Sequence, residues 1–241
     1  MTGFDATAVR VVACDIFGTT VDWRTGVAGQ VAAVAAEHGV DLDGGVFADD
    51  WRDRYLPSMR RVNDGLRDWA YLDTLHRESL DALLGDRGLA DAFDGAARDR
   101  LVRVWHRLPA WPDAADGLAR LRRRHVVAAL SNGGFALMTH LIKAAGLPFD
   151  CVLSAELARA YKPAPEAYLT AARLLDVAPS QILMVACHTW DIDGARAAGL
   201  ATAFLERPLE KGPAREADRA SATTSDLTVT GFPQLADVLG C

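Results

Sequence analysis

Short, almost uninterrupted apolar segments constrain the fold of this chain more than any other feature. Five of them have the length of β-strands and lie at residues 11–14, 126–130, 151–153, 182–186 and 201–205. Strands that are apolar on both faces are typical of a parallel sheet covered by helices on both sides. Helical patterns alternate with these strands, at residues 113–124, 136–145, 165–175 and 193–198. We therefore predict a doubly wound α/β core with a parallel sheet.

The alternation is interrupted after the first strand. Residues 23–105 show helical patterns only, at 27–38, 47–62, 69–84 and 90–105. We predict that residues 1–22 and 106–241 form the α/β core domain and that residues 23–105 form an all-helical domain inserted into it. The polar residues 207–225 are predicted to form a loop that could be mobile.

Composition and charge restrict the classes of function. The net charge of −6 over 241 residues argues against binding to nucleic acid or to a membrane surface. No apolar run approaches the ~20 residues that span a bilayer, and the N-terminus has no signal-peptide pattern. The four cysteines are too scattered for a zinc site and fit a reducing compartment. We expect a cytoplasmic protein, and no function for the histidines at 38, 76, 106, 125 and 140 beyond surface or helix-end roles.

Polar residues follow the ends of the predicted strands. Asp15 comes directly after the first strand, and Ser131 and Asn132 follow the second. In open α/β sheets, ligands bind beyond the carboxyl ends of the strands, so these side chains are expected to meet in one crevice. An aspartate after a strand is often only a turn former, and it is the combination that indicates a site.

Four motifs resemble, in this order, those of the haloacid dehalogenase superfamily. They are Asp15-x-Phe17-Gly18-Thr19, Leu130-Ser131-Asn132-Gly133, Tyr161-Lys162-Pro163 and Trp190-Asp191. The match spans the chain, and the helical insert stands in the position of the cap domain. The resemblance implies a Rossmann-like core with a helical cap. Most members of the superfamily are magnesium-dependent phosphatases.

Two departures from the phosphatase pattern indicate a subfamily. Phe17 stands where phosphatases carry a second aspartate that serves as general acid. Cys187 stands where they usually carry an acidic metal ligand, and a thiol is a poor ligand for the hard magnesium ion. Both features are expected in the L-2-haloacid dehalogenases, which need no metal and release a halide that needs no proton. Trp51-Arg52 and Tyr168 also resemble motifs of that subfamily.

The resemblance implies hydrolysis of short-chain (S)-2-haloacids to (R)-2-hydroxy acids without a metal or cofactor. Asp15 would attack the α-carbon, and water would then hydrolyse the aspartyl ester. Lys162 would keep Asp15 ionised, and Thr19 would donate a hydrogen bond to it. Asp191 would act as the base or orient the hydrolytic water.

The substrate and the departing halide would be held by further residues of the motifs. Ser131 and nearby backbone amides would bind the substrate carboxylate, while Arg52 and Asn132 would bind the halide. His188 replaces an asparagine that dehalogenases usually carry three positions before the last aspartate. It could hydrogen-bond Asp15 or the hydrolytic water.

Several of these residues have a structural alternative. Tyr168 is expected to order the Lys162 region or only to pack in its helix, and Phe17 and Trp190 fit a pocket wall as well as a core. Arg52 could instead form a surface salt bridge. Two other functions stay open: a phosphatase of small phosphate esters, and a non-catalytic binding protein with the same fold. The helical insert could offer a surface for a homodimer.

Overall fold

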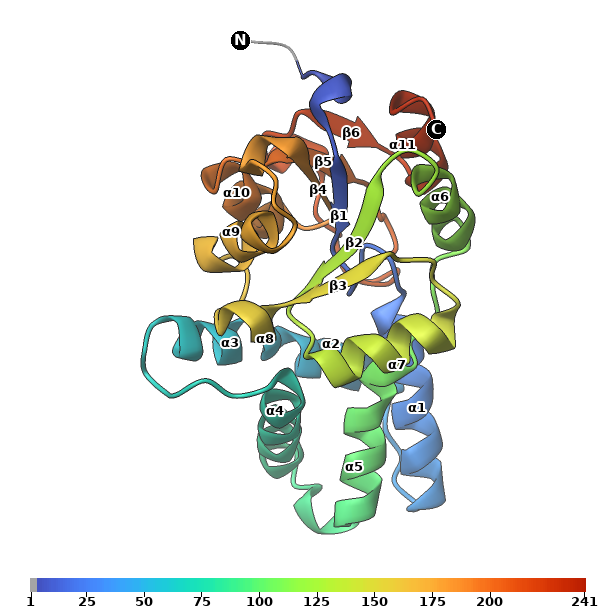
Figure 1. The fold of residues 1–241 in the computed structure, drawn as a ribbon. Helices are drawn as coiled ribbons and strands as arrows, with labels where there is room; N and C mark the ends of the chain where they lie inside the picture. Colours follow the sequence, from blue (N-terminus) through green and yellow to red (C-terminus); the bar gives the residue numbers. More distant parts are fainter. Residues whose placement is uncertain (1–3) are drawn as a thin grey trace.

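A computed structural model describes residues 4–241, so the first three residues of the predicted core, and predictions about the extreme N-terminus, lie outside the described part. A parallel sheet of six strands, in the order β3-β2-β1-β4-β5-β6, forms the centre (Figure 1). The strands are β1 (Val11–Cys14), β2 (Val126–Ser131), β3 (Cys151–Ser154), β4 (Ile182–Ala186), β5 (Ala201–Leu205) and β6 (Leu227–Val229). The five predicted strands are confirmed. The edge strand β6 was missed because it has three residues, of which one is exposed and one half-buried.

Helices cover both faces of the sheet (Figure 1). One face carries α6 (Ala114–Leu121), α7 (Phe135–Ala145) and α11 (Phe232–Val238), and the other carries α8 (Ala155–Ala158), α9 (Pro165–Leu174) and α10 (Thr189–Ala197). Side chains of β1 alternate between the two cores: Val12 and Cys14 pack with the first group, and Val11 and Ala13 with the second. The predicted doubly wound α/β core is confirmed.

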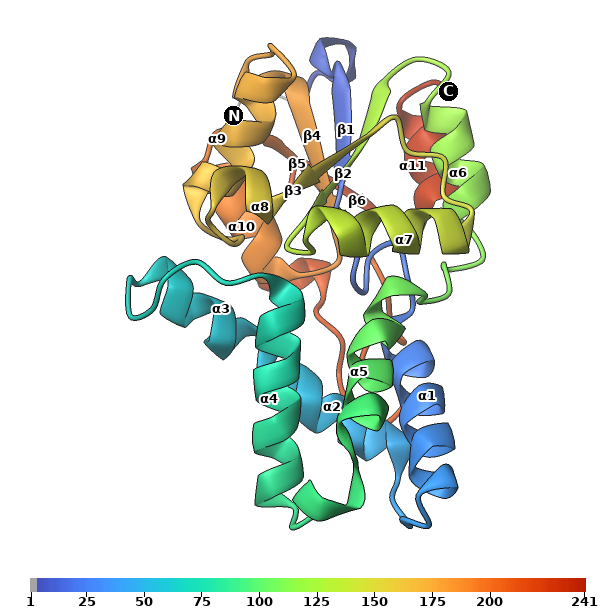
Figure 2. The ribbon, with the colours of Figure 1, turned by 60° about the horizontal axis from the view of Figure 1, so that its bottom comes forward.

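The insert consists of helices that lie beyond the carboxyl ends of the strands (Figure 2). They are α1 (Trp23–Glu37), α2 (Gly44–Asp53), α3 (Tyr55–Asn63), α4 (Leu72–Asp86) and α5 (Gly95–Arg103), followed by a 3-10 turn at Val104–His106. We propose on this basis that residues 23–105 form the cap domain. Strand order reverses at β1, so the crevice beyond its carboxyl end faces the insert.

Several predicted helix boundaries were wrong, two of them for a clear local reason. The helix expected at 47–62 is two helices, because Pro57 has no N–H and its ring clashes with the carbonyl of Asp53, where α2 ends. The helix expected from residue 90 begins at Gly95, where Asp94 caps it by accepting from the Ala97 N–H at 2.8 Å. The helix expected from residue 193 begins at Thr189, which puts Asp191 in its first turn.

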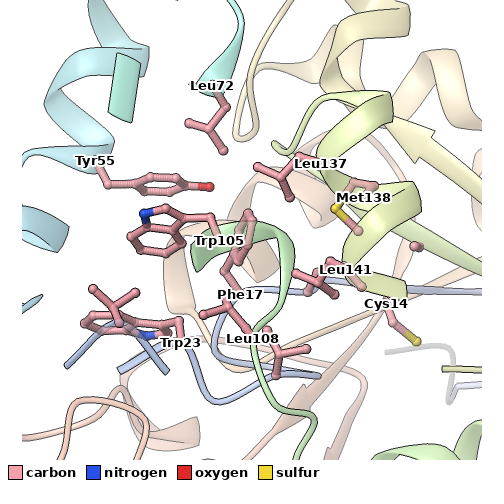
Figure 3. Packing of buried hydrophobic residues seen from close by; sticks show 14 of the residues in the cluster. Cys14, Phe17, Trp23, Tyr55, Leu72, Trp105, Leu108, Leu137, Met138 and Leu141 are labelled. Carbon is pink, nitrogen blue, oxygen red and sulfur yellow. The ribbon is translucent and has the colours of Figure 1, made fainter. Parts of the chain in front are cut away.

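An aromatic cluster joins the insert to the core (Figure 3). The Phe17 ring meets the Trp105 ring edge-on at 5.5 Å between centroids and the Tyr55 ring at 6.4 Å. Trp23 stacks on Trp105 at 6.2 Å. Such pairs contribute about 0.5–1.5 kcal/mol each beyond their buried area, so the insert is held firmly beside Asp15. Among residues 4–241, no helix is long and apolar enough to cross a membrane.

Candidate active site

Asp15 continues the line of β1 and is 4% exposed. Its N–H donates to the Val185 carbonyl on β4 at 2.9 Å, which holds the residue against the neighbouring strand. Gly18 then adopts φ +95°, a left-handed conformation that favours glycine and turns the chain back. The turn brings the Thr19 hydroxyl to donate to Asp15 Oδ2 at 2.8 Å, as expected, and Thr19 itself accepts from the Cys187 N–H.

Lys162 lies between two carboxylates. Its Nζ is 2.9 Å from Asp15 Oδ1 and 2.5 Å from Asp191 Oδ2, and the side chain is 1% exposed. The Asn132 amide fixes the Lys162 backbone, because Oδ1 accepts from the Lys162 N–H at 2.7 Å and Nδ2 donates to its carbonyl at 3.3 Å. Asn132, expected beside the halide, therefore holds the lysine in place.

The insert contacts the lysine segment directly. Asn63, the last residue of α3, donates from Nδ2 to the Tyr161 carbonyl at 2.8 Å and accepts from the Tyr161 N–H at 2.9 Å. The Tyr161 hydroxyl donates to the carbonyl of Ala70, also in the insert, at 2.6 Å. The residue preceding Lys162 is thus bonded to the insert through both its backbone and its side chain.

Asp191 is completely buried in the first turn of α10. Its Oδ1 accepts from the Tyr168 hydroxyl at 2.7 Å, while Oδ2 faces Lys162. Tyr168 therefore acts on the lysine region through Asp191. Its hydroxyl is hydrogen-bonded, so the tyrosine is more than helix packing.

His188 is buried at the start of α10 and lies between two further carboxylates. Its Nδ1 is 3.2 Å from Asp15 Oδ2, and its Nε2 is 3.3 Å from Glu210 Oε1. The Trp190 ring stacks on the imidazole at 5.3 Å between centroids. The ring therefore lies within ion-pair distance of Asp15, one of the two partners that the sequence allowed.

The charges of the site keep Asp15 ionised. Burial alone would raise the pKa of Asp15, but the Lys162 ammonium and the His188 ring outweigh burial and hold that pKa well below its usual value. Burial also works against the charge of Lys162, yet the two carboxylates around it raise its pKa above the usual value. The aspartate is therefore a carboxylate throughout the neutral range.

The pKa values of His188 and Asp191 are both raised, which favours the protonated form of each. Burial opposes the charged imidazolium, but the Cys187 sulfur and the Asp15 and Glu210 carboxylates raise the pKa of His188 well above its usual value. Burial raises the pKa of Asp191, and repulsion from Asp15 offsets part of the attraction of Lys162. Two groups with raised pKa values thus flank the Asp15 carboxylate.

Two further predicted residues reach the site, Ser131 from the core and Arg52 from the insert. Ser131 ends β2, is fully buried, and its Oγ accepts from the Gly133 N–H at 3.0 Å, which leaves its own hydrogen free. The Arg52 guanidinium lies 3.9 Å from the Tyr55 ring centroid, and its buried Nη1 has no hydrogen-bond partner among residues 4–241. A buried donor without an acceptor costs about 1–3 kcal/mol, so this arginine is prepared to bind an anion.

Two cavities adjoin these residues. One of about 210 Å³ is lined by Arg52, His188, Trp190 and Glu210 among others. A second of about 300 Å³ includes Lys162 in its lining, and Trp190 lines both. Trp190 is thus a pocket wall.

A model of the haloacid dehalogenase-like hydrolases matches residues 9–199 of the chain. The chain belongs to this family. The (S)-2-haloacid dehalogenase 1 of Pseudomonas sp. (strain CBS-3) is 32% identical over 205 residues, which are 83% of this chain and 85% of that protein.

Solved structures of haloacid dehalogenases match nearly the whole chain. The defluorinating L-2-haloacid dehalogenase Rha0230 is 42% identical with a TM-score of 0.93, and the match covers 97% of this chain and 96% of that one. The L-2-haloacid dehalogenase from Xanthobacter autotrophicus, solved with chloropropionic acid covalently bound, is 26% identical with a TM-score of 0.81 and covers 96% and 98%. The predicted L-2-haloacid dehalogenase subfamily is confirmed.

Phe17 and Cys187 distinguish this dehalogenase chemically from the phosphatases of its superfamily. Phe17 is 1% exposed, and its ring is packed in the aromatic cluster described above. The side chain fills a hydrophobic site and cannot transfer a proton. Cys187 is buried, and burial raises the pKa of its thiol. Among residues 4–241, no group of three or more His, Cys, Asp or Glu side chains is arranged to hold a metal ion.

Glu210 is the site residue that the sequence analysis missed. It lies in the polar segment 207–225, which was predicted only as a loop, yet it is 3% exposed. The same segment is anchored by Arg207, whose Nε donates to the Thr19 carbonyl at 2.9 Å. An acidic residue in a polar loop carries no periodic signal, so nothing in the sequence separates Glu210 from its exposed neighbours.

Proposed function

We propose that this dehalogenase hydrolyses short-chain (S)-2-haloacids to (R)-2-hydroxy acids through an ester on Asp15. The observation that carries the proposal is the buried Asp15 carboxylate. Lys162 and Thr19 hold it ionised, and no proton donor stands at position 17. Such a nucleophile suits a leaving group that departs as a stable anion. The names of the related dehalogenases support this choice of substrate and favour neither alternative function.

The first half of the reaction is a displacement at carbon. A carboxylate oxygen of Asp15 attacks the α-carbon, the carbon–halogen bond breaks, and the halide leaves with the bonding electron pair. The unpartnered Nη1 of Arg52 would stabilise the charge that develops on the halide. The Ser131 hydroxyl would donate to the carboxylate of the substrate. Attack from the side opposite the halide inverts the α-carbon.

The second half regenerates the enzyme. Water attacks the carboxyl carbon of the Asp15 ester, the bond from that carbon to the substrate oxygen breaks, and the hydroxy acid leaves. The Asp191 carboxylate takes one proton from the attacking water, and the His188 imidazolium gives one to the departing alkoxide oxygen. The proton on Asp191 restores the imidazolium, and the second proton of the water is released as the Asp15 carboxyl ionises. Because the water oxygen enters Asp15, the configuration set by the displacement is kept.

Metal independence is part of the proposal. The position from which related phosphatases supply an acidic metal ligand holds Cys187, and its thiol is a poor ligand for magnesium. The Lys162 ammonium stands between Asp15 and Asp191 at hydrogen-bond distance from both and compensates their charge.

We further propose that the enzyme works in the cytoplasm as a homodimer. Its four cysteines are free, which suits a reducing compartment. Large apolar side chains of the insert are exposed, among them Leu66 and Tyr71. Light scattering coupled to size exclusion tests the dimer, since a mass near 26 kDa would contradict it.

Halide release tests the proposed function. Chloro-, bromo- and fluoroacetate and both enantiomers of 2-chloropropionate are incubated with the enzyme, with and without a chelator. We expect release from the (S)-enantiomer that the chelator leaves unchanged, a covalent mass increase on Asp15 during turnover, and no release by Asp15→Asn. Magnesium-dependent hydrolysis of phosphate esters without halide release would overturn the proposal.

A further inference from the structure

We propose that Glu210 is a positioning residue that holds His188 as an imidazolium with Nδ1 directed at Asp15, an inference that rests on the proposed function. The imidazole bridges the two carboxylates. Its Nδ1 is 3.2 Å from Asp15 Oδ2, and its Nε2 is 3.3 Å from Glu210 Oε1. No resemblance to a motif assigns Glu210, and only the folded chain brings it to the site.

Glu210 is itself fixed in place. Its Oε1 accepts from the Trp23 indole N–H at 2.5 Å, and the side chain is 3% exposed. Trp23 begins α1 of the insert and stacks on Trp105, so its indole is part of the aromatic cluster. A buried carboxylate with one neutral donor needs positive charge nearby. The His188 ring contacts Glu210 directly, and the Arg52 guanidinium, which lines the same cavity, adds a second positive charge.

The turn after Asp15 is shaped to admit Glu210. A Cβ built on Gly18 would lie 2.7 Å from Glu210 Oε1 and 2.9 Å from its Cγ. Real Cβ atoms essentially never come this close, so any other residue at position 18 would displace the glutamate. Glu210 is therefore the residue at which three segments meet: the left-handed turn at Gly18, the loop after β5, and the start of α10 at His188.

The groups that face His188 determine its protonation. Asp15 and Glu210 lie on its two nitrogens, and the Cys187 sulfur is 3.7–3.8 Å from the ring. Farther out, Asp218 is paired with Lys211 at 2.6 Å, which largely cancels their effect. Removing the charge of Glu210 takes away one of two adjacent anions. The imidazolium then loses its proton at a lower pH.

Glu210 matters most after the ester has formed. Alkylation removes the negative charge of Asp15, and Glu210 is then the remaining anion in contact with the ring. With Nε2–H donated to Glu210, the ring keeps its orientation and Nδ1 stays beside the Asp15 ester. Loss of Glu210 should therefore slow ester hydrolysis more than displacement.

The test compares Glu210→Gln with Glu216→Gln, a matched change at an exposed site of the same loop. Halide release from chloroacetate is followed across pH 5 to 10. For Glu210→Gln we expect kcat to fall roughly tenfold or more while KM changes little, because orientation of an acid–base group is lost. The limb of the pH profile that reports His188 should move to lower pH by about 1–3 pH units. A profile that superimposes on that of Glu216→Gln would overturn the proposal.

Two further measurements separate positioning from a general structural effect. In a His188→Asn background, Glu210→Gln should have no additional effect, whereas equal losses in both backgrounds would refute a role through His188. Mass spectrometry of quenched reactions should find more ester on Asp15 in Glu210→Gln than in the parent. Glu210→Asp, which keeps the charge, should recover part of the rate.

An NMR titration of the histidine rings separates failure of this inference from failure of the proposed function. The His188 signal is assigned by its loss in His188→Asn. Even if the enzyme releases no halide from any haloacid, the midpoint of His188 should be lower in Glu210→Gln than in the parent. If Glu210→Gln does not fold, Trp23→Phe, which removes the indole donor to Glu210 and part of the stack on Trp105, should lower the midpoint by a smaller amount. An unchanged midpoint in the variant that folds would overturn the inference.

Discussion

Replacing Lys162 by methionine gives the largest predicted change in the pH dependence of this enzyme. The Nζ of Lys162 is 2.9 Å from Asp15 Oδ1 in a site where both side chains are buried. With an effective dielectric constant of about 20, this pair attracts by about 6 kcal/mol. At 1.36 kcal/mol per pH unit, that energy corresponds to about 4 pH units in the protonation of Asp15. Without the lysine, the protonation of Asp15 should therefore move up to the acid end of the pH range in which the enzyme can be assayed.

Initial rates of halide release from chloroacetate measure this effect between pH 5 and pH 10. The parent should have no acid limb from Asp15 in this range, because the folded-state pKa of that carboxyl lies below its usual value. Lys162→Met should gain an acid limb at the lower end of this range, with activity that rises with pH as Asp15 ionises. Lys143→Met, at an exposed lysine of α7, is the control and should match the parent. If Lys162→Met is equally slow at every pH, or has no more of an acid limb than the parent down to pH 5, the electrostatic reasoning is refuted.

Three further predictions concern packing and the halide. Both ring nitrogens of His76 are buried without a hydrogen-bond partner among residues 4–241, and burial lowers its pKa to about 3. The neutral ring therefore contributes fully to stability above about pH 6.5, the pKa of histidine in the unfolded chain, and this contribution is lost as the pH falls towards 3. In the parent, His76 should lower the free energy of unfolding by about 2 kcal/mol between pH 7 and pH 5. In His76→Phe, urea denaturation should show a decrease over this range that is smaller by that amount. Phe17→Asp should lower that free energy by about 4 kcal/mol or more without creating phosphatase activity, since it places a charge in the aromatic cluster. Arg52→Met should lower kcat by roughly 10²-fold in halide-release assays if its free Nη1 stabilises the leaving halide.

Each of these three has an outcome that would contradict it. An unchanged pH dependence of stability in His76→Phe would mean that the buried imidazole is not the titrating group. Phosphatase turnover by Phe17→Asp would mean that position 17 alone separates the two chemistries. For Arg52, the exposed Arg61 offers a matched control, and equal effects of Arg52→Met and Arg61→Met would exclude a specific role.

The strands and the residues at their ends could be predicted because both depend on local chemistry. Apolar runs identified β1 to β5, and the order of the motifs assembled Asp15, Lys162 and Asp191 at one edge of the sheet. The position of His188 relative to Asp191 was enough to expect its contact with Asp15. These predictions rest on residues that are near in sequence to a recognisable strand or turn.

The remaining features depend on contacts that sequence spacing does not encode. Glu210 is 187 residues from Trp23, and it was read as one more polar loop residue. His76 was expected at the surface or at a helix end because the histidines share no common spacing, yet it stacks on Trp105 at 4.3 Å between centroids. The bonds between the Asn132 amide and the Lys162 backbone were also not predicted. Contacts between segments that are far apart in the chain determine these three features.

The paired hydrogen bonds between Asn63 and Tyr161 have a consequence for how the enzyme admits its substrate. The insert cannot swing away from the sheet at this point without either breaking both bonds or pulling the peptide next to Lys162 along with it. The motion that admits a haloacid would then also displace the Lys162 ammonium group. In an open form of this enzyme, Lys162 would be displaced from Asp15. The aspartate would then become fully nucleophilic only when the insert closes around a bound acid.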